Sequence, residues 1–378
     1  METKQKEKEF VMQTYGRFDL VIAKGKGNYV FDKDGKKYLD FIAGIACVPV
    51  GHANKKVTKA ISKQANKLVQ VSNMYYTEPQ ADLAEKLAKL SGLKKCFFCN
   101  SGAEANEAAI KLAKKITKKT EFIVCNHAFH GRTHGSLSAT WKEQYKKPFL
   151  PLVDGFKFVE YNNVEAIENA IDEKTAAVMI EPIQGEAGII VPSDDYLKKV
   201  SEICKKKNVL LILDEVQTGN GRTGKYFAFL DSGIEPDIVT TAKGLGNGVP
   251  IGVCISKHDF DKGNHASTFG GNSLVCAAAN ATIDYILDND LMANAIKVGN
   301  YFMEKLKSLP KVEEVKGKGL MIGVDIKGDA LKVAVECLNK GLLLNTATEH
   351  TLRFLPPLTI KEKEVDEAIE ILKEVLSK

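Results

Sequence analysis

Lys243 stands where an apolar, β-rich segment meets a run of glycines. Residues 237–252 read Asp-Ile-Val-Thr-Thr-Ala-Lys-Gly-Leu-Gly-Asn-Gly-Val-Pro-Ile-Gly. A lysine that leaves a buried strand for a glycine-lined pocket loses part of its hydration, which favours the neutral amine over the ammonium ion. Such an amine can bond covalently to an aldehyde. The alternative is a solvated loop lysine, so the neighbouring motifs decide between the two.

A second candidate site lies at Ser101-Gly102-Ala103, between a predicted strand at 95–99 and the helical sequence AEANEAAIKLAKK. The N-terminus of a helix presents unpaired N–H groups and the positive end of the helix dipole, which together suit a phosphate. Gly102 would allow the phosphate to approach closely. The alternative is an ordinary helix start, with Ser101 as N-cap and Glu104 completing a capping box.

Acidic residues follow two further apolar segments. Asp214 ends the segment VLLIL, and Glu186 lies just beyond AAVMIEPI. A carboxylate that closes a buried strand needs a cationic partner, because an unpaired buried charge is costly. A protonated pyridine nitrogen would be such a partner for Asp214. A helix cap or an ion pair with an arginine is the alternative.

The order of the predicted elements indicates how these residues are brought together. Strands alternate with helices, which is typical of an α/β protein with a mostly parallel sheet. Ligands bind beyond the carboxyl ends of such strands. We therefore expect one pocket to contain the residues that follow those ends: Ser101, Gly102, Ala103, Phe129, Glu186, Asp214, Gln217 and Lys243. Before these elements, GNYVFDKDGKKYLDF predicts a β-hairpin turning at Asp34-Gly35, and helical periodicity covers 56–71 and 78–90.

Composition narrows the class of protein. The chain has 378 residues, a net charge of +5 and 27% charged residues, with the lysines scattered along the sequence, so nucleic-acid binding is not indicated. The N-terminal residues are polar and carry no signal-peptide pattern, and no apolar run reaches membrane-spanning length. The eight cysteines lie mostly in apolar segments, as reduced thiols do. We expect a cytoplasmic protein with no membrane partner.

Two other kinds of site compete with this interpretation. Residues 219–225 have the glycine and lysine spacing of a nucleotide-binding P-loop, but Tyr226 stands where that motif needs a hydroxyl group for magnesium, and no helix-forming run follows. The histidines of HAFHGRTH have zinc-helix spacing, but a glycine and the preceding strand argue against a helix there. No metal site is predicted.

The motifs together resemble the class III, pyridoxal-phosphate-dependent aminotransferases, and most closely their acetylornithine aminotransferase group. The resemblance extends from Tyr15 to Arg353 and includes SNMYYTEPQ, NSGAEANEAAIK, FHGRTHGSLSAT, EPIQGEAG, DEVQTGNGRTG, AKGLGNGVPIG and STFGGNSL. It implies a type I pyridoxal-phosphate fold. Residues 51–270 would form a large cofactor domain, and residues 1–50 and 271–378 a smaller α+β domain built from both chain ends.

The resemblance also implies a role for each matching residue. Lys243 matches the lysine that bonds the cofactor aldehyde, and Asp214 the carboxylate on its ring nitrogen. Ser101, Gly102 and Ala103 match the phosphate seat, Phe129 the stacked aromatic ring, and Val216 and Gln217 neighbours of the ring and its phenolic oxygen. Thr268 matches a phosphate ligand reaching the partner's cofactor in a homodimer. Arg132, Ser267, Arg353 and Glu186 match substrate contacts, with Arg353 holding a carboxylate of glutamate or 2-oxoglutarate and Glu186 pairing with it otherwise.

The expected reaction moves the δ-amino group of N-acetylornithine to 2-oxoglutarate. N-succinyl-diaminopimelate, ornithine and 4-aminobutyrate are alternative donors, and a non-catalytic phosphate- or nucleotide-binding protein is the alternative of another class. Ala103 replaces a common threonine and Ala187 a frequent glycine, whereas GIACVPVGH is an unusual form of its loop. Residues 42–52 contain no tyrosine, where ornithine aminotransferases are expected to place one, and this favours an acylated substrate.

Overall fold

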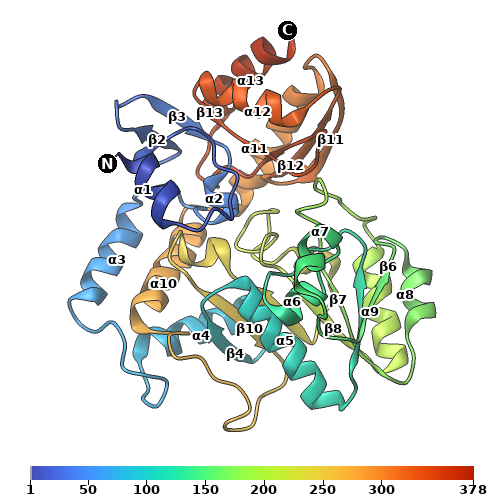
Figure 1. Cartoon of the computed structure of the whole chain (residues 1–378). Helices are drawn as coiled ribbons and strands as arrows, with labels where there is room; N and C mark the ends of the chain where they lie inside the picture. The colour runs from blue at the N-terminus through green and yellow to red at the C-terminus, as the bar shows by residue number, and fades with distance from the viewer. Residues whose placement is uncertain (1) are drawn as a thin grey trace.

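A seven-stranded sheet forms the centre of the computed structural model, which describes residues 2–378 (Figure 1). In sheet order its strands are β4 (Lys95–Cys99), β10 (Gly252–Ser256), β9 (Ile238–Thr241), β8 (Leu210–Asp214), β7 (Thr175–Ile180), β5 (Glu121–Cys125) and β6 (Phe156–Val159). Strand β10 is antiparallel to both neighbours, and the pairs from β9 to β6 are parallel. The sheet is therefore mostly parallel, as the alternating pattern predicts.

Both faces of this sheet are buried, which explains why its strands read as continuous apolar runs. In β5, Phe122 and Val124 belong to one core, whereas Ile123 and Cys125 belong to the other. The covering helices and the short elements near the sheet are α4 (Glu78–Ser91), α5 (Gly102–Thr117), α6 (His134–Ser138), α7 (Glu143–Lys146), η1 (Lys147–Phe149), α8 (Val164–Ala170), α9 (Tyr196–Lys207), η2 (Ala228–Ser232) and η3 (Lys243–Gly246).

Two smaller sheets lie apart from the central one, at the top of Figure 1. The first contains β1 (Ile22–Lys26), β2 (Tyr29–Asp32), β3 (Lys37–Asp40) and β13 (Leu342–Leu343). The second is antiparallel and contains β11 (Val312–Lys318), β12 (Met321–Ile326), β15 (Thr351–Phe354) and β14 (Asn345–Thr346). The predicted hairpin is present, because β2 pairs with β3 around the turn at Gly35.

The two ends of the chain share one core in this smaller part. Strand β3 pairs with β13 in parallel register, so the N-terminal hairpin is completed by a strand about 300 residues later. Leu39 and Phe41 join a cluster that includes Phe302 and Phe354. The remaining helices are α1 (Thr3–Phe10), α2 (Ala43–Ala46), α3 (Lys55–Ala65), α10 (Ser273–Asp288), α11 (Leu291–Lys307), α12 (Ala330–Asn339) and α13 (Glu362–Leu376). This smaller part, built from both chain ends, agrees with the expected fold class.

Helix α10 connects the two parts. Cys276 and Ile283 lie in the core beneath the large sheet, whereas Ala278 and Ile286 lie in the core of the smaller part. The boundaries at residues 50 and 270 remain a prediction, since this helix contributes to both cores.

The helix predicted over 56–71 is shorter than expected. Asn54 caps its start by accepting from the N–H groups of Lys56 and Val57, and the helix ends at Ala65. Beyond that point the Gln64 side chain donates to the carbonyl of Leu68 at 2.8 Å, which holds the chain in a turn. The helical pattern of the sequence extends beyond Ala65, but a sequence pattern cannot reveal a side-chain contact that ends the helix. Across residues 2–378, none of the helices has the length and apolar character needed to cross a bilayer.

Candidate active site

A cavity of about 380 Å³ lies beyond the carboxyl ends of the parallel strands. Polar and aromatic side chains from several segments line it. Those predicted from the sequence are Ser101, Gly102, Ala103, Phe129, Arg132, Asp214, Val216, Gln217 and Lys243. The structure therefore brings together residues that are as much as 142 positions apart in the chain, from Ser101 to Lys243.

The N-terminus of α5 forms one end of this cavity. The Ser101 hydroxyl accepts from the N–H of Glu104 at 3.2 Å, so Ser101 is the N-cap. The Glu104 carboxylate accepts instead from the N–H of Asn100, one residue earlier than in a capping box. Within residues 2–378, the N–H groups of Gly102 and Ala103 have no acceptor. They are free to bind an anion.

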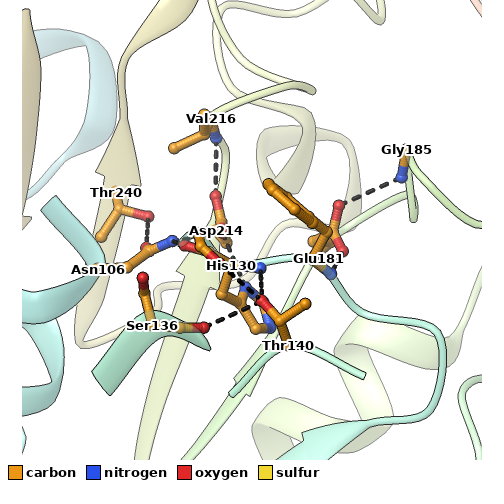
Figure 2. A network of polar contacts seen from close by, with 11 residues as sticks. Asn106, His130, Ser136, Thr140, Glu181, Gly185, Asp214, Val216 and Thr240 are labelled. Atoms are coloured by element: carbon orange, nitrogen blue, oxygen red, sulfur yellow. Dashed lines mark hydrogen bonds and ion pairs between the residues drawn. The ribbon is translucent and has the colours of Figure 1, made fainter. Parts of the chain in front are cut away.

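Asp214 forms another part of the wall and is held by a buried network, drawn in Figure 2. Its Oδ2 atom accepts from Asn106 Nδ2 at 2.7 Å and from His130 Nδ1 at 2.8 Å. Its Oδ1 atom accepts from the N–H of Val216 at 3.0 Å. Thr240 in turn donates to Asn106 at 2.7 Å, which fixes the orientation of the amide.

Asn106 and His130 are site residues that the sequence interpretation missed. Asn106 is a polar residue on the otherwise apolar buried face of α5, and His130 follows Phe129 directly. These two features of the sequence could have indicated a role in the site. Burial alone would lower the pKa of His130, but the hydrogen bond to Asp214 and its negative charge raise that pKa above its ordinary value. The Asp214 carboxylate therefore favours the protonated form of His130.

Glu181 is a third residue with no predicted role. It follows β7, lines the cavity and is almost fully buried. Its two carboxylate oxygens accept from the N–H of Phe129 at 3.0 Å and from the N–H of Gly185 at 3.2 Å. Figure 2 shows the contact with Gly185. Burial raises the pKa of Glu181. Glu181 therefore ties the loop that carries Phe129 to the loop that carries Glu186.

Lys243 begins the single turn η3, immediately after β9 and Ala242. Its φ of 42° lies in the left-handed region, which is uncommon outside glycine and is found at functional sites. The side chain is half-buried, and among residues 2–378 no carboxylate lies within ion-pair distance of it. Cys47, on the loop before α3, lines the same cavity. The amine of Lys243 therefore has no ion-pair partner among residues 2–378.

Arg353 and Glu186 form a buried ion pair next to the cavity. Arg353 Nη1 lies 2.5 Å from Glu186 Oε1 and also donates to the carbonyl of Gly185 at 3.0 Å. Its side chain is only 2% exposed. Burial alone would raise the pKa of Glu186, but the positive charges of Arg353 and Lys243 lower it below its ordinary value. Glu186 lines a second, smaller cavity that shares Phe129 with the first, rather than the first cavity itself.

Ser267 and Thr268 lie away from the other predicted residues. They line a separate cavity with Asn73 and Tyr76, and the Thr268 side chain is exposed. Ser267 accepts from Asn100, which lines the main cavity, at 3.3 Å, but Ser267 itself lines the separate one. Within a single chain, the structure does not bring these two residues into the site.

The structure does not support the two alternative sites, a P-loop at residues 219–225 and a zinc site at the histidines of HAFHGRTH. Residues 219–225 form consecutive turns, with Arg222 fully buried against the carbonyls of Leu320 and Pro356, and only a short 3-10 segment begins at Ala228. A P-loop needs a helix N-terminus at this point, which is lacking in this segment. His127 is exposed whereas His130 is buried on Asp214. Within the described residues, no three His, Cys, Asp or Glu side chains are grouped as a metal site would require.

Comparison with known proteins identifies the family. The model of the class III aminotransferases matches residues 10–376. The acetylornithine aminotransferase of Archaeoglobus fulgidus is 49% identical over 97% of this chain and 98% of its own length, and that of Methanocaldococcus jannaschii is 49% identical over 98% and 97%.

Solved structures agree. The ornithine aminotransferase from Toxoplasma gondii ME49 superposes with a TM-score of 0.95 at 32% identity, covering 100% of this chain and 96% of that one. The acetylornithine aminotransferase from Elizabethkingia anophelis gives a TM-score of 0.89 at 34% identity over 99% and 98%. Both the family and the fold predicted from the motifs are confirmed. The chain therefore belongs to the class III aminotransferases.

Proposed function

We propose that this aminotransferase uses pyridoxal phosphate to transfer the δ-amino group of N2-acetyl-L-ornithine to 2-oxoglutarate. The products are N-acetyl-L-glutamate 5-semialdehyde and L-glutamate, and the reaction belongs to arginine biosynthesis in the cytoplasm. The names of the relatives that are 49% identical support this substrate. The observation that carries the proposal is the shared cavity, because Lys243, Asp214 and the N-terminus of α5 all line it.

The residues present fit the cofactor. The free N–H groups of Gly102 and Ala103 suit its phosphate, and Asp214 suits a protonated ring nitrogen. Gln217 Oε1 is buried and has no hydrogen-bond partner within residues 2–378, so it is available to a donor in the cavity. Phe129 and Val216 supply apolar walls for a flat ring. Each of these features matches one part of pyridoxal phosphate.

The chemistry of each side chain indicates its role in the reaction. Pyridoxal phosphate, when bound, supplies an aldehyde for exchange of amines and a ring that withdraws electrons. Asp214 would pair with the protonated ring nitrogen, and the donors Asn106 and His130 hold its carboxylate in position. Lys243 Nζ could take a proton from the amine-bearing carbon of the substrate as a general base and then give it up as a general acid.

Glu186 and Arg353 account for the use of two different substrates. A free Arg353 binds a carboxylate of glutamate or 2-oxoglutarate through its planar, two-pronged guanidinium group. With the longer acylated amine, Glu186 neutralises the arginine through the contact of 2.5 Å. One site can then serve a diacid and an ω-amine by opening and closing this pair.

We further propose that the protein acts as a homodimer in which Thr268 binds the phosphate of the partner's cofactor and Ser267 lies near the partner's substrate. The exposure of Thr268 and its distance from its own cavity support a role outside its own chain. Met74, Tyr75 and Tyr76 lie on the neighbouring segment and are also largely exposed, which suits a surface that becomes buried in a dimer.

One experiment tests the main proposal. The purified protein should be yellow, and borohydride should fix the chromophore to Lys243, as peptide mapping would detect. Lys243→Ala should lower turnover by about 10²–10⁴-fold, the size typical of a lost general acid–base group. A colourless protein that binds ATP through residues 219–225 would contradict the proposal.

A side-by-side assay identifies the amino donor. N-acetylornithine should exceed ornithine, 4-aminobutyrate and N-succinyl-diaminopimelate in kcat/KM. Ornithine is the second candidate, because the Toxoplasma gondii structure of that name shares the fold closely. A higher kcat/KM for ornithine would make it the donor in place of the acetylated compound.

A further inference from the structure

A second cavity of about 180 Å³ adjoins the main one, and Phe129 lines both. Its other lining residues include Trp141, Lys142, Tyr145, Glu186 and Thr348, and Lys142 Nζ lies 5.6 Å from the centre of the Tyr145 ring. The fold fixes these rings: the backbone N–H of Trp141 donates to the carbonyl of Ala128 at 2.9 Å, and the Tyr145 ring meets the Phe129 ring edge-on at 6.3 Å. None of the roles assigned above involves Trp141, Lys142 or Tyr145.

This cavity lies on the substrate side of the reacting amine. The Glu186 carboxylate, on the cavity wall, is close enough to both Lys243 and Lys142 for each to lower its pKa. The Arg132 guanidinium, which lines the main cavity, stacks 3.5 Å from the centre of the Tyr145 ring. The space bounded by Trp141 and Tyr145 is therefore placed to receive the far end of a substrate whose reacting amine lies near Lys243.

The charges around the cavity determine which chemical group of the substrate it can bind. Lys142 has no carboxylate within 4 Å among residues 2–378, and Arg132 presents a second cation beside it. The one acid on the wall, Glu186, is neutralised by Arg353. A free α-ammonium group would be repelled by Lys142 and would lose hydration against the aromatic rings. A neutral acyl amide avoids both costs, because its apolar part packs on the rings and its carbonyl oxygen accepts from Lys142.

We propose that the cavity of Trp141, Lys142 and Tyr145 is the subsite for the acyl group of the amino donor, and that Lys142 is the residue that discriminates acylated from free α-amines. This inference rests on the proposed function and deepens it. It assigns the selectivity to a charge on the N-cap residue of α7 and to the aromatic rings around it.

Kinetics of Lys142 variants test this assignment. In Lys142→Glu, the ratio of kcat/KM for N-acetylornithine to that for ornithine should fall by about ten-fold or more, equivalent to ~1.4 kcal/mol. Lys142→Gln, which keeps a donor but loses the charge, should give an intermediate ratio. Lys147→Gln is the matched control, because Lys147 is exposed and lies outside the cavity.

Fluorescence supplies a readout independent of turnover. Trp141 is the only tryptophan of the chain, so its emission reports on this cavity alone. In the borohydride-reduced holoenzyme, which cannot turn over, N-acetyl-L-norvaline should shift or quench this emission in a saturable way. L-ornithine should require a concentration at least about ten-fold higher. In Lys142→Glu, this preference should shrink.

The two hypotheses fail in different ways. If the wild-type protein converts glutamate but neither acylated nor free ornithine, the proposed substrate is wrong. If it prefers N-acetylornithine but the preference is the same in all Lys142 variants and the emission of Trp141 is unaffected by N-acetyl-L-norvaline, the subsite assignment is wrong and the proposed function stands.

Discussion

His130 Nδ1 lies 2.8 Å from the Asp214 oxygen that also accepts from Asn106. Both donors therefore use one oxygen, Oδ2. Among residues 2–378, the other oxygen, Oδ1, accepts only from the N–H of Val216. A carboxylate oxygen has room for a further donor. The network thus orients Asp214 so that Oδ1 is available to the cavity that it lines.

We predict that Asp214→Asn lowers kcat/KM by about 10²–10³-fold, the range typical of one lost electrostatic contact in an active site. Asn106 and His130 both donate, so the single oxygen of the new amide would turn towards them and its NH₂ group towards the cavity. An NH₂ group cannot pair with a protonated ring nitrogen. Steady-state kinetics would measure the loss, and an unchanged melting temperature would show that the fold is intact. Wild-type activity would contradict the assigned role.

Glu186→Ala should change the balance between the two substrates. Without Glu186, Arg353 stays free and binds the glutamate carboxylate without first breaking an ion pair. The longer amine then meets an unneutralised guanidinium group. We expect the ratio of kcat/KM for N-acetylornithine to that for glutamate to fall by about ten-fold, measured in single-turnover half-reactions. An unchanged ratio would count against the switching role of the pair.

Glu215 makes the stability of the protein depend on pH. Burial raises its pKa to about 7 from the ordinary 4.5, so the folded protein holds a proton that the unfolded chain releases earlier. The free energy of unfolding should therefore fall as pH rises from about 4.5 to about 7. Each pKa unit is worth about 1.4 kcal/mol, which makes the total loss about 3 kcal/mol.

Glu215→Gln removes this dependence, because the amide resembles the protonated acid and does not titrate. The variant should gain stability relative to the wild type between about pH 5 and about pH 8 in urea unfolding. Exposed Glu202 provides the control, and Glu202→Gln should leave the pH dependence as it is. Parallel stability curves for Glu215→Gln and the wild type would refute the prediction.

Gly252→Ala should weaken cofactor binding without touching the cofactor. A methyl group at Gly252 would lie 2.1 Å from the carbonyl oxygen of Ser101, and backbone atoms cannot move aside as a side chain can. Relief of this clash shifts Ser101 and with it the first N–H groups of α5. We expect at least a ten-fold rise in the Kd for pyridoxal phosphate, by absorbance titration, equivalent to ~1.4 kcal/mol. Gly16→Ala, which meets nothing within 4 Å, is the control.

Hybrid dimers test the proposed exchange of residues between subunits. Lys243→Ala and Thr268→Ala should each impair both sites of a homodimer. If Thr268 serves the partner's site, a hybrid of the two variants has one site with both changes and one site with neither. Mixing the two impaired preparations under exchange conditions should then raise activity, to about half of the wild-type value per hybrid. No recovery after verified exchange would show that Thr268 does not act across the interface.

The sequence was most informative where short-range patterns decide the structure. Lys243, Asp214 and Ser101 each stand at the end of an apolar strand, and a mostly parallel sheet brings such ends together. The hairpin around Gly35 likewise depends on adjacent residues. These features needed no knowledge of which strands are neighbours.

Long-range contacts were not predictable in the same way. The contact of Asn106 with Asp214 joins residues 108 positions apart and depends on the order β4-β10-β9-β8, in which the antiparallel β10 was not anticipated. In the sequence, nothing distinguishes Glu181 from the other acidic residues. Its role depends on the contact of two loops with its carboxylate. Ser267 and Thr268 line a separate cavity of this chain, and a role for them in a site depends on the proposed homodimer.

The parallel pairing of β3 with β13 has a consequence for the order in which the protein assembles. During synthesis the N-terminal hairpin leaves the ribosome long before Leu342 exists, so β3 has an unpaired edge for most of translation. Leu39 and Phe41 also cannot be buried in this core before Phe302 and Phe354 have been synthesised. The smaller part of the molecule can therefore fold only after the chain is nearly finished, whereas the large sheet already has all its strands once residue 256 has emerged.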